Sequence, residues 1–339
     1  MEKLENAIID IKTAFPGMKI LENEPMDRHC SFRVGGPIRA LAFPSDVSSL
    51  AKLCCILKEH ELAPLMLGNC TNTVFPDEGM PDVFAVCTEK LSKLFLLDDG
   101  AIYAESGVPL SRLAAFAQQN GLAGLEFASG IPGTVGGGVM MNAGAYGGEL
   151  KDAVESVVCY YLPEQRLYEV TADKCGFEYR NSLFKKMPGN VIMSAVFRLE
   201  SGDKDKIAAK MREFNELRRE KQPLDLPSAG SAFKRPEGHF AARLIDEAGL
   251  RGFAVGGAQV SEKHTGFIVN TGSATAADIH ELMKQVRKKV YESSQILLEP
   301  EIILYPPDYK LEDRGPQVPR NDIIRMMPDD GWEASPAEN

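Results

Sequence analysis

Three segments of the chain combine glycine with small polar residues in patterns that could bind a phosphate-containing anion. They are residues 32–37 (FRVGGP), residues 67–75 (LGNCTNTVF) and residues 128–148, in which eight of 21 residues are glycine. Glycine permits positive φ angles and lets consecutive N–H groups point into one concavity, as a diphosphate requires. Any one segment alone is equally well explained as a tight turn, but three together favour a dinucleotide or a similar anion.

The chain lacks the spacings of several familiar nucleotide and hydrolytic sites. No GxxxxGK[ST] motif occurs and no GxGxxG motif lies in or near residues 128–148, which argues against a P-loop ATPase and a Rossmann NAD site. No serine lies in a GxSxG elbow with ordered Ser, His and Asp partners, so a hydrolase is not predicted. The His and Cys residues show no zinc-type spacing, and we predict no metal site.

Three further places could handle carboxylates and protons. Arg180 in GFEYRNSLFKK could hold a carboxylate or phosphate through paired hydrogen bonds, although a surface arginine explains the position more simply. Ser228 and Ser231 lie in a small-residue loop, LDLPSAGSAFKRPEG, where a serine could donate a proton or be an ordinary loop residue. Glu299 and Glu301 alternate in ILLEPEIILY, which predicts a strand with both carboxylates on one face, one of them facing a pocket. A solvated edge strand is the alternative.

The hydrophobic pattern predicts the elements that would position these residues. Helical spacing is found at residues 47–62, 109–121, 204–222, 240–250 and 275–294, so only one helix is expected before residue 75. Strands are expected near residues 63–67, 156–162, 166–172, 191–199, 256–260, 265–270 and 296–305. Because strands and helices mix without a steady βαβ alternation, the pattern predicts an α+β fold. A boundary near residue 200 would separate a glycine-rich cofactor unit from a smaller cap unit.

Composition limits the partners and the compartment. An apolar fraction of 44% and a charged fraction of 25% are typical of a folded globular protein. No run of about eighteen apolar residues occurs, and the N-terminus is acidic where a secretory signal would be basic, so we expect a cytoplasmic protein with no membrane partner. A net charge of −10 argues against nucleic-acid binding. Seven scattered cysteines without a CxxC pair predict free thiols. Six prolines after Tyr305 predict a disordered tail.

Eight motifs, taken in order, resemble the UDP-N-acetylenolpyruvoylglucosamine reductase family, flavoenzymes of peptidoglycan precursor synthesis. They are HCSFRVGGP, LGNCTNTVFPDEG, GLEFASGIPGTVGGGVMMNAGAYGGE, YRNSLF, PSAGSAFKRP, LIDEAGLRG, QVSEKHTGFIVN and LEPEI. The resemblance spans about residues 25–305. It implies a two-part FAD-binding unit of the vanillyl-alcohol-oxidase (PCMH) type and a C-terminal α+β substrate-binding domain. We expect FAD-binding subdomains at 1–85 and 86–200, the substrate-binding domain at 201–305, and an acidic, Pro-rich tail at 306–339.

The resemblance also implies a reaction and its residues. In the family NADPH reduces FAD and leaves, and a hydride then adds to the enolpyruvyl ether of UDP-N-acetylglucosamine, giving UDP-N-acetylmuramate. On this pattern Ser231 is the proton donor, and Arg180 and Glu301 stabilise the enolate intermediate. The residues expected to bind FAD are Arg33, Val34, Gly35, Gly36, Gly68, Asn69, Cys70, Thr71, Asn72, Gly130, Ile131, Pro132, Gly133, Thr134, Gly136 and Gly137. Those expected to bind substrate are Lys221, Lys234, Arg235 and His264.

The chain departs from the family pattern at several positions. Cys70 stands where the family usually has serine, and Arg235 stands where it usually has asparagine, which would alter a substrate contact. The arginine that usually follows the last motif is missing, and so is the insertion that carries a gating tyrosine. The shorter, second subclass of the family is therefore expected, as a monomer or weak dimer.

Two other functions stay open. One is a different flavin oxidoreductase of the same fold acting on an alcohol or sugar, where flavin is often attached covalently. The other is a non-catalytic flavin- or nucleotide-binding module, which would bind flavin but turn over no substrate.

Overall fold

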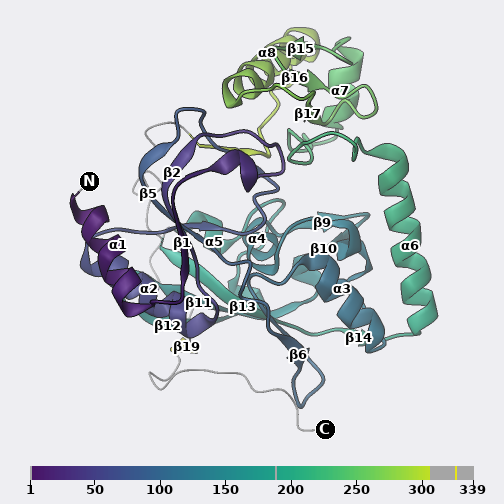
Figure 1. Ribbon diagram of the computed structural model, residues 1–339. Coiled ribbons are helices and arrows are strands. Elements are labelled where there is room, and N and C mark those ends of the chain that lie inside the picture. The colour runs from purple at the N-terminus through teal and green to yellow at the C-terminus, as the bar shows by residue number, and fades with distance from the viewer. Residues whose placement is uncertain (1, 188, 306–324, 327–339) are drawn as a thin grey trace.

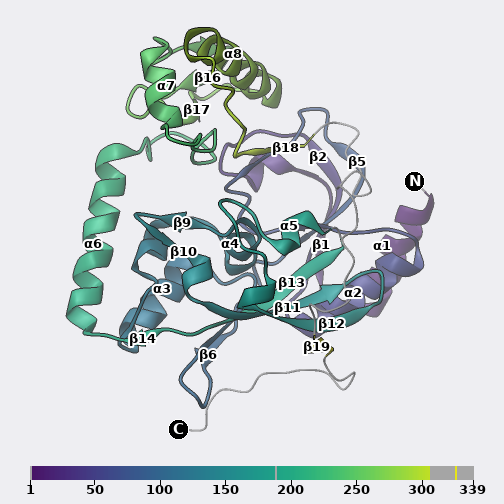
Figure 2. The ribbon, with the colours of Figure 1, turned by 180° about the vertical axis from the view of Figure 1, so that it is seen from behind.

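The computed structural model describes residues 2–187, 189–305 and 325–326. Helices and strands mix irregularly along this part of the chain, so the predicted α+β class is confirmed. Figures 1 and 2 show an N-terminal unit, a middle unit and a C-terminal unit, with the long helix α6 (Lys204–Lys221) running along one side from the middle unit to the C-terminal unit.

The N-terminal unit contains a four-stranded sheet and two helices. Its strands lie in the order β1 (Lys19–Pro25), β2 (Pro37–Phe43), β5 (Met80–Cys87) and β3 (Leu65–Leu67), with only β1–β2 antiparallel. Helix α2 (Val47–Glu59) is confirmed, and its expected apolar face is buried. The prediction of a single helix was wrong, because α1 (Glu2–Ala14) also forms. Its buried residues recur at helical spacing: Leu4, Ala7, Ile8 and Ile11.

A six-stranded sheet forms the middle unit. In spatial order it contains β19 (Arg325–Met326), β12 (Arg166–Thr171), β11 (Val154–Tyr161), β13 (Asn190–Phe197), β7 (Ile102–Glu105) and β6 (Leu94–Leu96). The three long strands confirm the predictions for residues 156–162, 166–172 and 191–199. Helix α3 (Leu110–Gln119) is confirmed with its N-cap at Pro109, and Gly121 follows it with a φ of 68°.

The middle unit also holds a helix that the sequence did not predict. Helix α4 (Val135–Met141) lies inside the glycine-rich segment, although glycine disfavours helix. Its start is fixed by Thr134, whose Oγ1 accepts the N–H of Gly137 at 3.4 Å. The remaining short elements up to residue 201 are η1 (Met26–Arg28), β8 (Leu122–Ala123), η2 (Glu126–Gly130), β9 (Gly144–Ala145), β10 (Gly148–Glu149), η3 (Leu150–Asp152), η4 (Ala172–Lys174), α5 (Leu183–Lys186) and β14 (Glu200–Ser201).

The C-terminal unit places two helices beside a small antiparallel sheet. The helices are α7 (Ala241–Glu247) and α8 (Ala276–Ser294), and the sheet order is β15 (Ala254–Val255), β16 (Ala258–Val260) and β17 (Ile268–Asn270). Helix α8 begins with a capping box, since Thr275 and Asp278 exchange side-chain and backbone hydrogen bonds.

The predicted strand over residues 296–305 is wrong. Only β18 (Ile303–Leu304) forms there, and it pairs in parallel with β4 (Thr73–Val74) of the N-terminal unit. Glu299 and Glu301 differ in burial: the Glu299 side chain is 69% exposed and the Glu301 side chain 13%. Pro300 between them cannot donate to a strand ladder, and the pairing changes from residues 232–234 at Glu299–Glu301 to Asn72 and Val74 at Ile303 and Tyr305.

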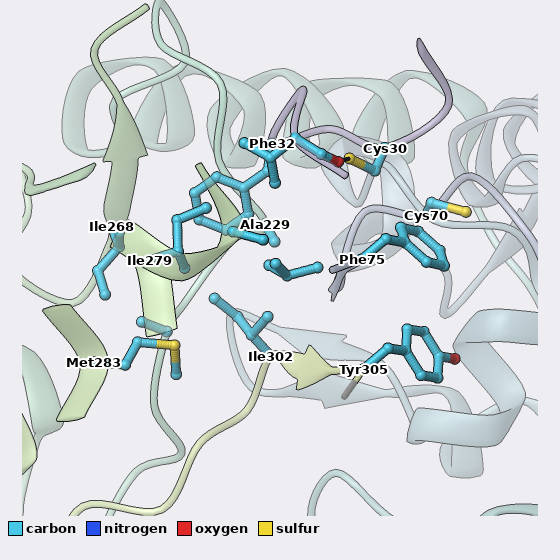
Figure 3. Packing of buried hydrophobic residues seen from close by; sticks show 14 of the residues in the cluster. Cys30, Phe32, Cys70, Phe75, Ala229, Ile268, Ile279, Met283, Ile302 and Tyr305 are labelled. Carbon is cyan, nitrogen blue, oxygen red and sulfur yellow. Dashed lines mark hydrogen bonds between the residues drawn. The ribbon is translucent and has the colours of Figure 1, made fainter. Parts of the chain in front are cut away.

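One hydrophobic core joins the N-terminal and C-terminal units. Figure 3 shows Phe32, Phe75 and Cys70 packed in the same cluster as residues of the C-terminal unit, among them Ile279 and Ile302. Asn270 ties the same units together by a buried hydrogen bond, 2.9 Å from its Nδ2 to the carbonyl oxygen of Phe32. The two units are therefore packed together, and the domain boundaries at residues 85 and 200 stay predictions.

The predicted disordered tail, residues 306–339, lies outside the described residues except for β19. Those two residues pair antiparallel with Tyr168 and Glu169 of β12, an addition to the sheet edge that the sequence did not predict.

Candidate active site

The three glycine-containing segments meet in space. The N–H of Ser31, just before the first segment, donates to the carbonyl oxygen of Cys70 in the second at 3.2 Å. Asn69 in the second donates through Nδ2 to the carbonyl oxygen of Pro132 in the third at 2.9 Å. Contacts between residues 39 and 63 positions apart in sequence therefore bring the three segments together, as a single extended ligand requires.

Left-handed backbone conformations gather at this junction. Non-glycine residues with positive φ include Arg33 (57°), Cys70 (47°), Asn142 (43°), Tyr146 (51°) and Arg180 (55°). Such conformations are costly for L-residues and cluster at functional sites, where the surrounding structure holds them. Alternating left- and right-handed residues also turn successive N–H groups to one side, which suits an anion.

Some of the glycines are explained by contacts between protein segments. A Cβ added to Gly36 would lie 2.1 Å from the carbonyl oxygen of Asp77, and one added to Gly68 would lie 2.4 Å from Thr134 Oγ1. Neither position has room for a methyl group. The same holds, at 2.6–2.9 Å, for three further predicted cofactor residues: Gly35, Gly130 and Gly136.

Two other glycines leave open space beside the backbone. The nearest atom to an added Cβ would be 3.8 Å away at Gly133 and 3.6 Å away at Gly137. Protein packing does not require glycine there, so the bare backbone is free to face a ligand. Around them Asn69 and Pro132 are exposed, while Arg33 is exposed in the first segment. The side chains of Val34, Cys70 and Thr134 are buried, so only their backbone could face a ligand.

The structure joins Arg180, Glu301 and the Ser231 segment. Arg180 Nε donates to Glu301 Oε1 at 2.6 Å and its Nη2 donates to the carbonyl oxygen of Gly144 at 3.1 Å, with both charged side chains mostly buried. The N–H of Glu301 donates to the carbonyl oxygen of Ala232 at 2.9 Å, directly after Ser231. Three segments separated by 50 residues or more therefore converge beside the glycine-rich segment.

A second contact ties this group to the glycine turns. Asn72 donates through Nδ2 to the carbonyl oxygen of Glu301 at 3.1 Å. Ser231 itself is half-buried and forms an isolated antiparallel bridge with Phe267, so its backbone conformation is fixed. The backbone of Glu301 is thus held by Asn72 and Ala232, with Ser231 as the preceding residue of the same loop.

The predicted substrate-binding residues differ in how they relate to the Arg180–Glu301 pair. Arg235 is close: its N–H donates to the Tyr179 hydroxyl at 3.2 Å, and its guanidinium carbon lies 4.1 Å from the centre of the Phe240 ring. Lys234 Nζ pairs with Glu299 at 3.0 Å near the surface. Lys221 is the exposed last residue of α6.

His264 packs against Phe267, the bridge partner of Ser231. Its ring lies 5.0 Å from the ring of Phe267, and its Nδ1 accepts the N–H of Gly266 at 3.1 Å. Burial lowers the pKa of His264 below its usual value, so the ring is neutral near pH 7. A neutral imidazole can donate or accept one hydrogen bond but adds no positive charge.

Sequence reasoning missed the buried residue Asn142, which connects the glycine-rich segment to the Arg180 turn. Its Nδ2 donates to Glu149 Oε2 at 2.9 Å and to the carbonyl oxygen of Glu178 at 3.1 Å, while its Oδ1 accepts the N–H of Lys151 at 3.0 Å. It ends α4 in a left-handed conformation, a position that favours glycine or asparagine. Asparagine after a glycine-rich helix was the available signal.

Comparisons with known proteins identify the family of the chain. A model of the FAD binding domain matches residues 38–162, and a model of the UDP-N-acetylenolpyruvoylglucosamine reductase, C-terminal domain, matches residues 222–305. The UDP-N-acetylenolpyruvoylglucosamine reductase of Caldanaerobacter subterraneus subsp. tengcongensis is 44% identical over 287 residues, covering 84% of this chain and 93% of the relative. That of Limosilactobacillus reuteri is 42% identical over 293 residues, covering 86% and 97%. The chain belongs to the UDP-N-acetylenolpyruvoylglucosamine reductase family.

A solved reductase has the same fold. The crystal structure of the UDP-N-acetylenolpyruvylglucosamine reductase from Thermus caldophilus matches with a TM-score of 0.73 at 32% identity, covering 85% of this chain and 100% of that one. The family resemblance and the predicted fold class are therefore confirmed: an FAD-binding unit followed by a smaller α+β domain. The protein is an FAD-binding oxidoreductase of this family.

Three further observations concern the part of the chain that the structure describes. Among those residues, no helix is long and apolar enough to cross a membrane, and no group of three or more His, Cys, Asp or Glu side chains could hold a metal ion. All seven cysteines are free thiols, as predicted.

Proposed function

We propose that the protein reduces the enolpyruvyl ether of UDP-N-acetylglucosamine to UDP-N-acetylmuramate, with NADPH as electron donor and FAD as resident cofactor. Family membership supports the reaction. The observation that carries its assignment to this site is the Arg180–Glu301 pair, hydrogen-bonded through Glu301 to the residue after Ser231. Such a reaction serves peptidoglycan precursor synthesis, and we place the enzyme in the cytoplasm as a monomer or weak dimer.

The three glycine-containing segments fit FAD. Open space beside the backbone of Gly133 and Gly137 would let a diphosphate or ring approach closely, and the Asn69 and Thr71 side chains lie next to it. We propose that the sixteen predicted residues of these segments surround the cofactor. When bound, FAD would supply the hydride that NADPH provides.

Arg180 would hold the carboxylate of the substrate. Hydride addition to the methylene carbon moves an electron pair toward the adjacent carbon and its carboxylate, so negative charge grows beside the guanidinium. Glu301 and the carbonyl oxygen of Gly144 fix that guanidinium before substrate arrives, which avoids reorganisation during the reaction.

Ser231 would donate the proton that completes the reduction. The carbanion next to the carboxylate takes the hydroxyl proton, and the serine recovers a proton from solvent. Serine is a weak acid, so positive charge near the oxygen must stabilise the alkoxide. Arg180 would supply part of this positive charge. For the nucleotide portion of the substrate, we propose contacts with Lys221, Lys234, Arg235 and His264.

The decisive test is an assay of purified protein, NADPH and UDP-N-acetylenolpyruvoylglucosamine followed at the absorbance of NADPH. Substrate-dependent oxidation is expected. Bound flavin without such oxidation would favour the non-catalytic flavin-binding module. Activity with alcohols or sugars alone would favour a different flavin oxidoreductase of the same fold. Flavin that stays on acid-precipitated protein would favour covalent attachment and count against the proposal.

We expect Gly133→Ala to weaken FAD binding without destabilising the apoprotein. The new methyl group would meet no protein atom closer than 3.8 Å, but it would enter the space proposed for the cofactor. A steric overlap of this kind costs about 1–3 kcal/mol, or about 5- to 150-fold in the dissociation constant of FAD. Flavin fluorescence titration measures the binding, and thermal unfolding of apoprotein measures stability.

Two further glycine variants serve as controls for that experiment. Gly17→Ala should change neither quantity, because nothing lies within 4 Å of the added atom. Gly36→Ala should destabilise the apoprotein, since its Cβ would overlap the carbonyl oxygen of Asp77. Unchanged FAD affinity in Gly133→Ala would show that the cofactor does not approach this backbone.

A further inference from the structure

The turn that carries Arg180 places an arginine where glycine is usual. Glu178 and Asn181 exchange two backbone hydrogen bonds, 3.0 and 3.2 Å long, so Tyr179 and Arg180 are the central residues of a four-residue turn. Arg180 has a φ of 55° at the third position, where a type II turn needs glycine or asparagine. The surrounding structure must therefore hold this conformation.

Contacts from two directions hold Arg180. Its guanidinium is fixed by Glu301 and Gly144, and stacks 5.0 Å from the centre of the Tyr179 ring. Its carbonyl oxygen accepts a hydrogen bond from Lys185 Nζ at 3.3 Å. The bond from Lys185 therefore restrains the backbone of Arg180 in its left-handed conformation, and this backbone sets the point from which the guanidinium extends.

Lys185 differs from its neighbour Lys186. Lys186 is largely exposed and pairs with Glu178 at 2.6 Å. Lys185 is half-buried, and its ammonium forms no ion pair with any carboxylate of residues 2–187 and 189–305. Burial and the charge of Lys234 lower the pKa of Lys185, while Glu301 opposes them. The site thus contains a half-buried lysine that forms no ion pair within the described residues, next to the place proposed for the substrate carboxylate.

We propose that Lys185 is a positioning residue for the reduction, which holds the carbonyl oxygen of Arg180 and so directs the guanidinium to the substrate carboxylate. The inference rests on the proposed function. The ammonium of Lys185 also adds positive charge beside the Arg180–Glu301 pair, and this charge favours an anionic substrate over a neutral one.

Four variants of the FAD-loaded enzyme test this role. Lys185→Met removes the hydrogen bond and the charge, Lys185→Gln keeps a donor without charge, and Lys185→Arg keeps both. Lys186→Met is the matched control. Rapid mixing measures flavin reduction by NADPH and flavin reoxidation by UDP-N-acetylenolpyruvoylglucosamine separately, and steady-state assays give kcat and KM.

Lys185→Met is expected to lower kcat/KM for the enolpyruvyl substrate by about 10- to 100-fold, the usual loss for a charged hydrogen bond. FAD retention and flavin reduction by NADPH should stay within about twofold of wild type, a change too small to register as a lost contact. The kcat/KM of Lys185→Gln should lie between those of Lys185→Met and wild type, and Lys185→Arg should recover most of the lost kcat/KM. Lys186→Met should keep the wild-type kcat/KM.

Other results would overturn the inference. If Lys185→Met turns over substrate at the wild-type rate, Lys185 has no positioning role, but the proposed function stands. Equal losses in both half-reactions, or loss of folded FAD-loaded protein in both the Met and Gln variants, make Lys185 a general structural residue. A wild-type protein without substrate-dependent NADPH oxidation removes the proposed function, and the inference with it.

Discussion

Replacing Ser231 with alanine is expected to leave flavin reduction by NADPH nearly unchanged while slowing flavin reoxidation by substrate about 10²- to 10⁴-fold, the usual contribution of a general acid. The hydroxyl would be needed only after hydride addition, when a carbanion must take a proton. The backbone of Ser231 forms the bridge to Phe267 and that of Ala232 binds Gly266 and Glu301, and alanine preserves all of these. Stopped-flow absorbance of the flavin separates the two half-reactions.

Ser228→Ala is the matched control, since Ser228 lies in the same loop and is also half-buried. It should keep both rates. If Ser231→Ala slowed both half-reactions equally, the proton-donor role would be wrong. If neither rate changed, another acid in the site would have to protonate the carbanion.

Arg180→Gln is expected to lower kcat/KM for the enolpyruvyl substrate by about 10²- to 10³-fold, because it removes the cation that faces the growing charge. The variant also leaves Glu301 mostly buried without its partner, which adds repulsion toward the substrate carboxylate. Steady-state kinetics should show a raised KM together with a lowered kcat, since the guanidinium would bind the substrate and stabilise its enolate.

Glu301→Gln separates these two causes. The amide oxygen can still accept from Arg180, so the guanidinium should stay in place and the loss should be about tenfold, near that of one weakened hydrogen bond. The double variant should lose little more than Arg180→Gln alone, because both residues act through one group. Arg243→Gln, at an exposed pair with Glu247, is the control and should behave as wild type. Full activity of Arg180→Gln would contradict the assignment.

The helices with a clear apolar stripe were predictable from sequence. The apolar residues at helical spacing are all buried in both α2 and α3, because this spacing alone decides which side meets the core: Leu50, Leu53, Cys54 and Leu57 in α2, and Leu110, Leu113, Ala114 and Ala117 in α3. Helix α1 carries the same signal and was overlooked. Helix α4 could not have been found this way, because three consecutive glycines have no helix propensity and only the Thr134 cap and tertiary packing form it.

The strand predicted over residues 296–305 failed for a different reason. Alternating apolar residues indicate a strand only when one neighbour runs alongside, but here Pro300 and Glu301 pair with residues 232–234 while Ile303 pairs with Asn72. Tertiary contacts of this kind leave no periodic trace in the sequence.

The candidate site was predictable mainly through the family resemblance. Residue types alone left Arg180 as a surface arginine and Ser231 as a loop serine, because their contact with Glu301 joins segments far apart in sequence. Lys185 could not have been distinguished from Lys186 in "FKK", since only the turn of α5 buries the first and exposes the second. Among the glycines, only the structure separates those that make room for protein from those that leave room for a ligand.

The core shared by the two ends of the chain has a consequence for the order of folding. During synthesis a domain usually folds as soon as its own residues have emerged. Here Phe32 and Phe75 pack in the same cluster as Ile279 and Ile302, and β4 pairs with β18. The N-terminal unit therefore completes its core only after the C-terminal unit has left the ribosome. Closing so long a loop is slow, and it leaves apolar surface open to chaperones and to aggregation in the meantime.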